Sequence, residues 1–560
     1  MRALLPLLFL LGWLMACHPT EPADLVLRGG IIHTLQGDQP QAEAVAIRGN
    51  RIVYVGDAKG AEAFIAAPTR VMDLQGRTVT PGLIEGHAHL MGLGQFQRNL
   101  DLTQTRSYDD LVAAVAEAVK TTPEGQWITG RGWHQSKWTP QPQPMITGYQ
   151  THEALSAVSP DHPVYLKHAS GHAAFANAKA MELAGITPET QIGGDGEIIR
   201  YPDGRATGIF TEAAARLIEQ HIPANDSTQL ALDLQAAIDA CLRHGITGFH
   251  DAGVSQRIIN LYQAFDDQGK LPLRLHVMLR GSDEALLQNW YARGPMLGAH
   301  LSVRAIKLYA DGALGSRGAW LLEPYTDRPT HVGNPIMPVE AIERVARQGL
   351  QHGFQVCTHA IGDRANREVL NAYERALADA PQAADTARFR IEHAQHLHPD
   401  DIPRFAELGV IPAMQAIHLS SDRPWAIDRL GKQRIREGAY VWQKLLQSGV
   451  PIINGTDAPV EPVDPIACLY ASVTRQTLDG VPPGGYESTQ KMTRAQALRS
   501  YTLDAAYGAF REEDLGSIAV GKLADLTVFD QDLMTVPDSA LLDTRVLMTI
   551  IDGEVVYAAE

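Results

Sequence analysis

The chain has 560 residues, 45% hydrophobic and 20% charged, the composition of a soluble globular protein too long for one simple core. The formal net charge of −16 argues against a nucleic-acid partner, because such a partner requires a basic protein surface. Apart from Cys17, the cysteines are Cys241, Cys357 and Cys468. They lie among apolar residues and cannot all pair, so we expect buried thiols rather than a disulfide framework.

Residues 1–17, MRALLPLLFLLGWLMAC, have the pattern of a signal peptide. A positive Arg2 precedes an apolar stretch that is too short to span a bilayer. The last four residues resemble a bacterial lipobox, in which Cys17 is lipidated and becomes the mature N-terminus; ordinary cleavage is the alternative. His18 is not the aspartate associated with inner-membrane retention. We therefore expect a periplasm-facing lipoprotein of the bacterial cell envelope, held at the outer membrane by this anchor alone.

Short strand-like segments with Gly and Asn turns occupy both ends of the chain, residues 24–77 and 512–560. They predict a small β-sandwich built from both termini. Between them, apolar strands alternate with helical patterns, which favours parallel βα units. Residues 78–94 and 226–511 are predicted to form a (β/α)8 TIM barrel, an α/β fold. Residues 95–225 are predicted to be a cap segment, inserted after the first barrel strand and covering the rim.

Eight apolar runs supply the number of strands that such a barrel needs. They are Val79–Ile84, Ile246–His250, Leu273–Met278, Val303–Tyr309, Gln355–His359, Phe389–His393, Val410–Met414 and Pro451–Asn454.

Ligand-type side chains stand at the ends of five of these runs. Each has a simpler reading when taken alone: a chance HxH pair, a lysine paired with a carboxylate such as Asp311, a structural histidine or a helix-capping aspartate. Together they offer nitrogen and oxygen ligands at one rim, which predicts a metal site. The residues are His87, His89, Lys307, His359, His393 and Asp457.

With these ligand-type residues in this order, the chain resembles the amidohydrolase superfamily of metal-dependent hydrolases, and most closely its amidohydrolase family 3 branch. The resemblance runs from Leu25 to Tyr557. It rests on PGLIEGHAH, GRGWHQSKW, GITGFHDAG, IKLYADGALGSR, THAIGD, RIEHAQ, GTDAPVEPVDP and GSIAVGKLADLTVFD.

The resemblance implies one or two zinc ions. His87 and His89 would hold one ion with Asp457, while His359 and His393 would hold the other. Lys307 would bridge them as a carbamate, whose negative charge offsets the charge of the metals in a buried site. A metal-activated hydroxide would attack the substrate, with Asp457 moving the proton.

Other polar residues near the strand ends are weaker candidates. We expect substrate contacts from Trp133, His172, Asp363, Gln415 and His418, with packing or helix capping as the alternative for the first three. His250 and Asp251 are expected to support the site or the fold. Glu85 shares strand parity with His87 and should lie behind the metals, whereas Glu392 has the opposite parity to His393 and should point away.

The predicted activity is zinc-dependent hydrolysis of a non-peptide C–N bond, in an amide, imide or N-acyl amine, with a small molecule as the substrate. Two alternatives remain open. The same fold supports isomerases, because fold does not fix reaction. A degenerate surface binding protein is the other alternative, although the complete ligand set argues against it.

Overall fold

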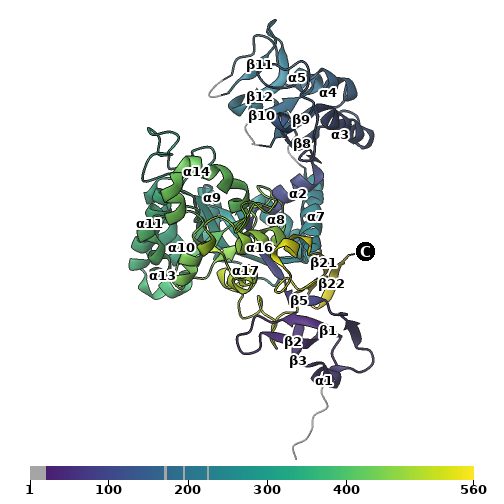
Figure 1. Ribbon diagram of the computed structural model, residues 1–560, viewed down its shortest axis with the longest axis vertical. Coiled ribbons are helices and arrows are strands. Elements are labelled where there is room, and N and C mark those ends of the chain that lie inside the picture. The colour runs from purple at the N-terminus through teal and green to yellow at the C-terminus, as the bar shows by residue number, and fades with distance from the viewer. Residues whose placement is uncertain (1–20, 170–172, 193–195, 224–225, 560) are drawn as a thin grey trace, which may run out of the picture.

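In the computed structural model, the structure describes residues 21–169, 173–192, 196–223 and 226–559. The predicted signal peptide with Cys17, and His172, lie outside the described residues. Figure 1 shows a barrel with a sheet from both chain ends below it and an inserted unit above it. Among the described residues, no helix is both long and apolar enough to cross a membrane.

The barrel consists of eight strands, and each strand pairs in parallel with the next one along the chain. The predicted TIM-barrel-like α/β fold is therefore confirmed. In order, the strands are β6 (Leu83–Ala88), β13 (Ile246–Val254), β14 (Arg274–Arg280), β15 (Leu301–Tyr309), β16 (Gln355–Ala360), β17 (Arg390–His393), β18 (Ile411–Met414) and β19 (Ile453–Asn454).

The ring is closed by the chain that follows the last strand. Asp457 N donates to His87 O at 2.8 Å, and His89 N donates to Ala458 O at 2.8 Å. Gly86 makes this seam possible, because a Cβ there would lie 2.4 Å from Asn454 O. The carboxyl ends of the first and eighth strands therefore meet.

The prediction that the first barrel strand spans Val79–Ile84 is wrong. This run is divided between two sheets: β5 (Thr78–Pro81) pairs with strands of the terminal sheet, and β6 enters the barrel. The change occurs at Gly82, whose N–H donates to Asp525 O at 2.8 Å. A Cβ at Gly82 would lie 2.3 Å from Thr247 Oγ1, so glycine permits the close approach.

Helices cover the outside of the barrel, as Figure 1 shows. The strand residues are almost continuously buried, as expected for parallel strands covered on both faces. The main helices between the barrel strands are α7 (Ser227–Arg243), α8 (Gln256–Asp267), α9 (Glu284–Arg293), α10 (Val339–His352), α11 (Asp363–Ala378), α13 (Ile402–Glu407), α14 (Ala416–Gly438) and α15 (Trp442–Gln447).

The two chain ends pair in one eight-stranded sheet, in which β5 lies between strands from either end. That its halves pack as a sandwich stays a prediction. A buried Arg274 from the barrel reaches this sheet and bonds Asp525 at 2.6 Å. The sheet comprises β1 (Leu25–His33), β2 (Gln41–Arg48), β3 (Arg51–Gly56), β4 (Arg70–Asp73), β5, β20 (Leu526–Phe529), β21 (Val546–Ile551) and β22 (Glu554–Ala558).

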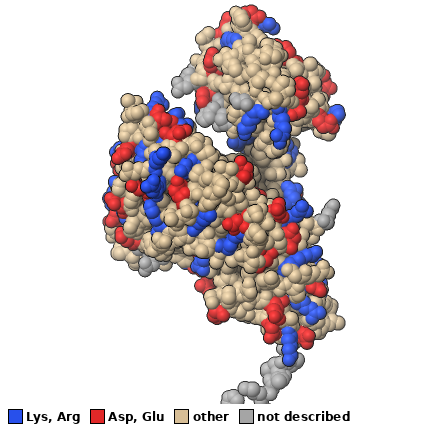
Figure 2. Space-filling model, in the orientation of Figure 1, with Lys and Arg blue, Asp and Glu red and all other residues tan. Residues whose placement is uncertain are grey.

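The inserted unit has its own six-stranded sheet and its own apolar core. Helix α2 (Leu90–Arg98), which packs beside α7, connects the insert to the barrel. Figures 1 and 2 show a narrow connection at these helices. The strands of the insert are β7 (Leu100–Asp101), β8 (Ile128–Trp133), β9 (Val164–His168), β10 (Ala173–Ala176), β11 (Ile198–Arg200) and β12 (Ala206–Thr211). That this unit covers the rim stays a prediction.

Candidate metal centre

The structure brings all six predicted ligands together at the carboxyl ends of the barrel strands. His87 and Lys307 are each only 1% exposed, and His393 and Asp457 are also buried. Lys307 Nζ lies 3.1 Å from His87 Nε2. Asp457 Oδ1 lies 3.3 Å from His89 Nε2 and 3.7 Å from His87 Nε2.

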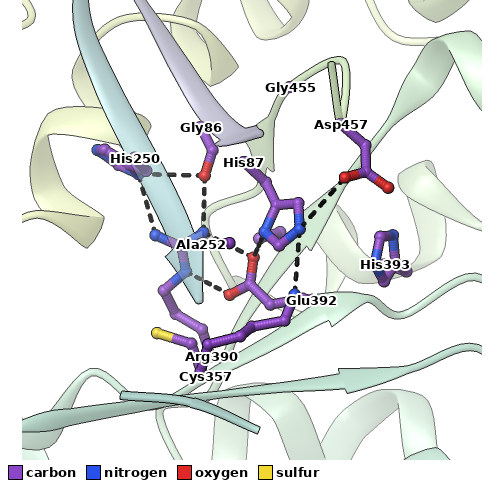
Figure 3. Close-up of polar contacts among 12 residues, drawn as sticks. Gly86, His87, His250, Ala252, Cys357, Arg390, Glu392, His393, Gly455 and Asp457 are labelled. Carbon is purple, nitrogen blue, oxygen red and sulfur yellow. Dashed lines mark hydrogen bonds and ion pairs between the residues drawn. The ribbon is translucent and has the colours of Figure 1, made fainter. Parts of the chain in front are cut away.

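Two further imidazoles complete the cluster. The ring centroid of His393 is 5.1 Å from that of His87 and 4.5 Å from that of His359. His87, His393 and Asp457 each offer one ligand atom, and these atoms lie within 4.8 Å of one another. Figure 3 shows Asp457 and His393 on one side of His87.

Two of these ligands occupy the left-handed region of backbone space, with φ 57° at Asp457 and 74° at His393. Non-glycine residues rarely adopt this conformation, and it persists where surrounding contacts enforce it. At Asp457 the bond from its N–H to His87 O supplies that constraint. The backbone is thus held in a shape that turns both side chains toward the cluster.

The prediction that Glu392 points away from the metals is wrong. Its carboxylate bonds His87 Nδ1 and also accepts from Arg390 Nε at 2.7 Å. The prediction assumed that neighbouring strand residues point to opposite faces. This alternation ends at His393, where positive φ turns the His393 side chain to the face that Glu392 occupies. Figure 3 shows Glu392 between Arg390 and His87.

Burial and neighbouring charge set protonation states that suit metal binding. Burial lowers the pKa of Lys307, which favours the neutral amine. Burial, then the charge of Lys307, lowers the pKa of His87 to about 4. At Asp457 burial opposes ionisation, but the close contact with His89 and the charges of the histidines outweigh it and hold its pKa well below the usual range. At neutral pH His87, His359 and His393 are therefore neutral and Asp457 is ionised. At His89 burial opposes the charged ring, but the contact with Asp457 outweighs it and raises the pKa.

The donor set fits a divalent metal such as zinc, which binds imidazole nitrogen and carboxylate oxygen. His359 Nε2 and Asp457 Oδ1 are buried and make no hydrogen bond of normal geometry with any described residue. Buried polar atoms are seldom left without a partner. Bound metal at the cluster would give each of these atoms a partner.

The alternative that Lys307 pairs with Asp311 does not hold in the structure. Asp311 accepts instead from three backbone N–H groups, those of Trp320, Ile361 and Gly362, at 2.8–2.9 Å. Across the described ranges, Lys307 makes no ion pair with any carboxylate.

Glu85 lies behind the cluster, as its parity predicts. Its carboxylate accepts from Thr456 N at 2.7 Å and from His87 N at 3.3 Å, so it braces the backbone beside Asp457. Burial raises the pKa of Glu85 to about 8. A Cβ at Gly455 would lie 2.3 Å from this carboxylate, which explains the glycine in the loop.

Two other predicted residues support the fold around the cluster. Asp251 accepts from Leu90 N at 2.9 Å and from Tyr262 Oη at 2.6 Å. His250 Nδ1 lies 3.0 Å from Arg390, the buried arginine that our sequence reasoning missed. A charged residue inside the apolar strand RFRIEH was the available signal.

The predicted substrate contacts divide into two groups. Gln415 Oε1 lies 2.6 Å from His393 Nδ1, and the ring of His418 stacks on His393 with centroids 6.0 Å apart. Both belong to the cluster. Trp133 is instead fully buried in the insert, donating from Nε1 to Leu166 O at 2.9 Å. Asp363 begins α11 and accepts from Leu322 N at 2.9 Å, which is the helix-end alternative.

A parallel barrel with imidazole and carboxylate ligands at the carboxyl ends of its strands is the arrangement of a metal-dependent enzyme. The sequence pattern described as Amidohydrolase family matches residues 70–557. Amidohydrolase YtcJ of Bacillus subtilis (strain 168) is 31% identical over 539 residues, which cover 95% of this chain and 99% of that protein. The chain therefore belongs to the amidohydrolase family and is a metal-dependent amidohydrolase.

Two further similarities agree with this assignment. N-substituted formamide deformylase of Arthrobacter pascens is 29% identical over 553 residues, covering 96% of this chain and 99% of that protein. The crystal structure of a metal-dependent hydrolase from Pyrococcus furiosus has a TM-score of 0.75 at 28% identity, covering 91% of this chain and all of that one.

Changing Glu392 to Gln should weaken metal binding about 10- to 100-fold, because the carboxylate that orients His87 and raises its basicity is lost. Competition with a chelator measures this affinity. Glu512→Gln, which removes the carboxylate partner of Arg388 far from the cluster, is the matched control. Equal affinity in the Glu392→Gln variant and the wild type would show that His87 needs no carboxylate behind it.

Proposed function

We propose that the protein is a zinc-dependent hydrolase of non-peptide C–N bonds, acting on an amide, imide or N-acyl amine. The observation that carries this proposal is the cluster itself. Four histidines, an aspartate and a buried lysine that pairs with no described carboxylate converge at the rim of the barrel. Zinc suits these donors.

One or two zinc ions would be held by two groups of ligands. His87, His89 and Asp457 would form one group, and His359 and His393 the other. Lys307 lies beside His87 Nε2 and would bridge the groups after carboxylation. Carboxylation requires the neutral amine, which burial favours because it lowers the pKa of Lys307. When bound, the metal would acidify water and polarise the scissile carbonyl.

Asp457 would move the proton. Its carboxylate is ionised, and its buried Oδ1 faces the cluster with no normal hydrogen bond to a described residue. It would accept a proton from the attacking water at Oδ1 and deliver it to the leaving nitrogen, which general acid–base catalysis requires. His89 Nε2, at 3.3 Å, fixes the direction of this carboxylate.

The activity is tested by a hydrolysis screen of the zinc-loaded protein with N-acyl amino acids, N-substituted formamides, cyclic amides and carbamates. Similarity to N-substituted formamide deformylase places formamides in this panel. We expect ¹⁸O from labelled water in the acid product, and a 10²- to 10⁴-fold lower kcat for Asp457→Asn, roughly the contribution of one acid–base group. Product without label would point to an isomerase on the same site and would sink the hydrolase proposal.

Lys307→Ala should lose bound zinc as well as activity, because no anion then joins the two ligand groups. Short carboxylic acids such as propionate should partly restore both by occupying the place of the carbamate. Zinc per chain, measured by elemental analysis, reports the result independently of turnover. Lys120→Ala, a change on the exposed face of the insert, is the control. Wild-type zinc content in Lys307→Ala would remove Lys307 from the site.

We further propose that the protein is a lipoprotein of the bacterial cell envelope, facing the periplasm and attached to the outer membrane through Cys17. The lipobox-like sequence before Cys17 supports this. Cys17→Ala should release the protein from membranes, measured by fractionation and immunoblotting. Retention of Cys17→Ala in the membrane fraction would count against the anchor.

A further inference from the structure

We propose that Arg280 and Tyr309 form an anion-binding subsite beside the metal centre, and that the substrate carries a carboxylate close to its scissile C–N bond. This inference rests on the proposed function and names the substrate class that the site selects.

The sheet geometry places both side chains next to a predicted metal ligand. Arg280, the last residue of β14, pairs laterally with Lys307 on β15, so both side chains leave the sheet on the same face. Tyr309 follows Lys307 by two residues and shares that face. Arg280, Lys307 and Tyr309 therefore lie together at the carboxyl end of the barrel.

The guanidinium of Arg280 and the phenol of Tyr309 both lie beside Gly253. Arg280 Nε donates to Gly253 O at 3.3 Å. The hydroxyl of Tyr309 lies 3.5 Å from the position that a Cβ on Gly253 would take. Gly253 has φ +80°, so a side chain there would be strained as well as in contact with the hydroxyl. The glycine keeps this part of the rim open.

The subsite borders the metal cluster directly. The ring centroid of Tyr309 is 5.1 Å from Lys307 Nζ and 5.6 Å from the ring centroid of His359. On the other side, the carbonyl of Ala252, the neighbour of Gly253, lies 3.0 Å from His89 Nδ1. A group bound by Arg280 and Tyr309 would thus sit next to a carbonyl held at the metal centre.

The side chains of Arg280 and Tyr309 both have donor groups that bond to no described residue. Within the part of the chain that the structure describes, the side chain of Arg280 makes no ion pair and no hydrogen bond beyond the one from Nε, and the Tyr309 hydroxyl makes no hydrogen bond. Arg280 is exposed and Tyr309 half-buried. By contrast, Arg274, Arg388 and Arg390 are each held by a carboxylate.

An arginine fork matches a carboxylate in a bidentate geometry, and a phenol can donate a third hydrogen bond to the same group. The protein as a whole carries a net charge of −16. Arg280, which pairs with no described carboxylate, therefore supplies a local attraction for an anion beside the site. Formyl or acyl derivatives of amino acids place a carboxylate next to the amide nitrogen. They are the substrate class that this subsite fits.

The test compares N-formyl and N-acetyl amino acids with their methyl esters, which have nearly the same shape but lack the negative charge. For the zinc-loaded full-length enzyme we expect kcat/KM for the acid to exceed that for the ester about 10- to 100-fold, the range of a charge-assisted hydrogen bond. Arg280→Met should remove this preference by raising KM for the acid with little change in kcat. Tyr309→Phe should reduce the preference several-fold.

Arg293→Met is the matched control, since it removes one exposed arginine from α9, where the side chain stacks on Trp290. It should leave both substrates unaffected. Equal loss of acid and ester hydrolysis in Arg280→Met, or no preference for the acid in the wild type, overturns the subsite while the proposed function stands.

If the wild type releases amine from neither substrate, the proposed function fails, and calorimetric titration of the zinc-loaded protein with an N-acetyl amino acid and its ester still decides the subsite. Tighter binding of the acid by the wild type, lost in Arg280→Met, supports it. Equal binding of acid and ester by the wild type overturns it.

Discussion

The metal centre depends on the seam between the first and last barrel strands. The bonds from Asp457 N to His87 O and from His89 N to Ala458 O join segments about 370 residues apart in sequence. Without this seam the ligands on β6 and the aspartate after β19 would belong to separate sheet edges. Gly86 and Gly455 leave the space that the seam requires, so closure of the fold and assembly of the site are one event.

A second constraint fixes the histidine rings. Nδ1 of His87 is bonded by Glu392, Nδ1 of His89 by Ala252 O and Nδ1 of His393 by Gln415. Each contact occupies the same ring nitrogen, which leaves Nε2 for the centre of the cluster.

The carboxylate behind His87 requires its own support. Glu392 is wholly buried with Arg390, and removing either partner of such a pair costs about 3–5 kcal/mol because a charge is left alone. Replacing both by apolar residues would avoid that cost but would leave His87 without its acceptor. The buried pair of Arg390 and Glu392 is thus explained by its effect on the orientation of His87 rather than by a contribution to the stability of the fold.

The sequence alone was sufficient to predict the barrel and the clustering of the six predicted ligands, for a physical reason. Parallel strands end at one rim, so a polar residue that stops a buried apolar run points to a shared place, whatever its distance along the chain. Local rules failed where the backbone departs from regular strand geometry. Positive φ at His393 turned the His393 side chain to the face that Glu392 occupies, so parity relative to His393 gave the wrong side for Glu392. Gly82 allowed one apolar run to contribute to two sheets.

Residues whose role depends on three-dimensional neighbours were beyond sequence reasoning. Arg280 and Tyr309 belong to different strands, and only the structure shows that both lie beside Gly253, which is the basis for proposing them as a pair. For Trp133 the structure favours the packing alternative. An aromatic residue in a motif of the insert suggested a pocket, but its side chain fills the core of that unit.

Helix α2 connects the insert to the candidate metal centre. The helix starts directly after His89, and Leu90 N is fixed by Asp251. It packs so tightly on α7 that a Cβ at Gly94 would lie 1.8 Å from Asp233 O, and Arg98 ties the far end to Asp233 at 2.6 Å. The helix thus runs from His89, a predicted metal ligand, to the insert. A displacement of the insert that tilts α2 would therefore move the backbone at His89.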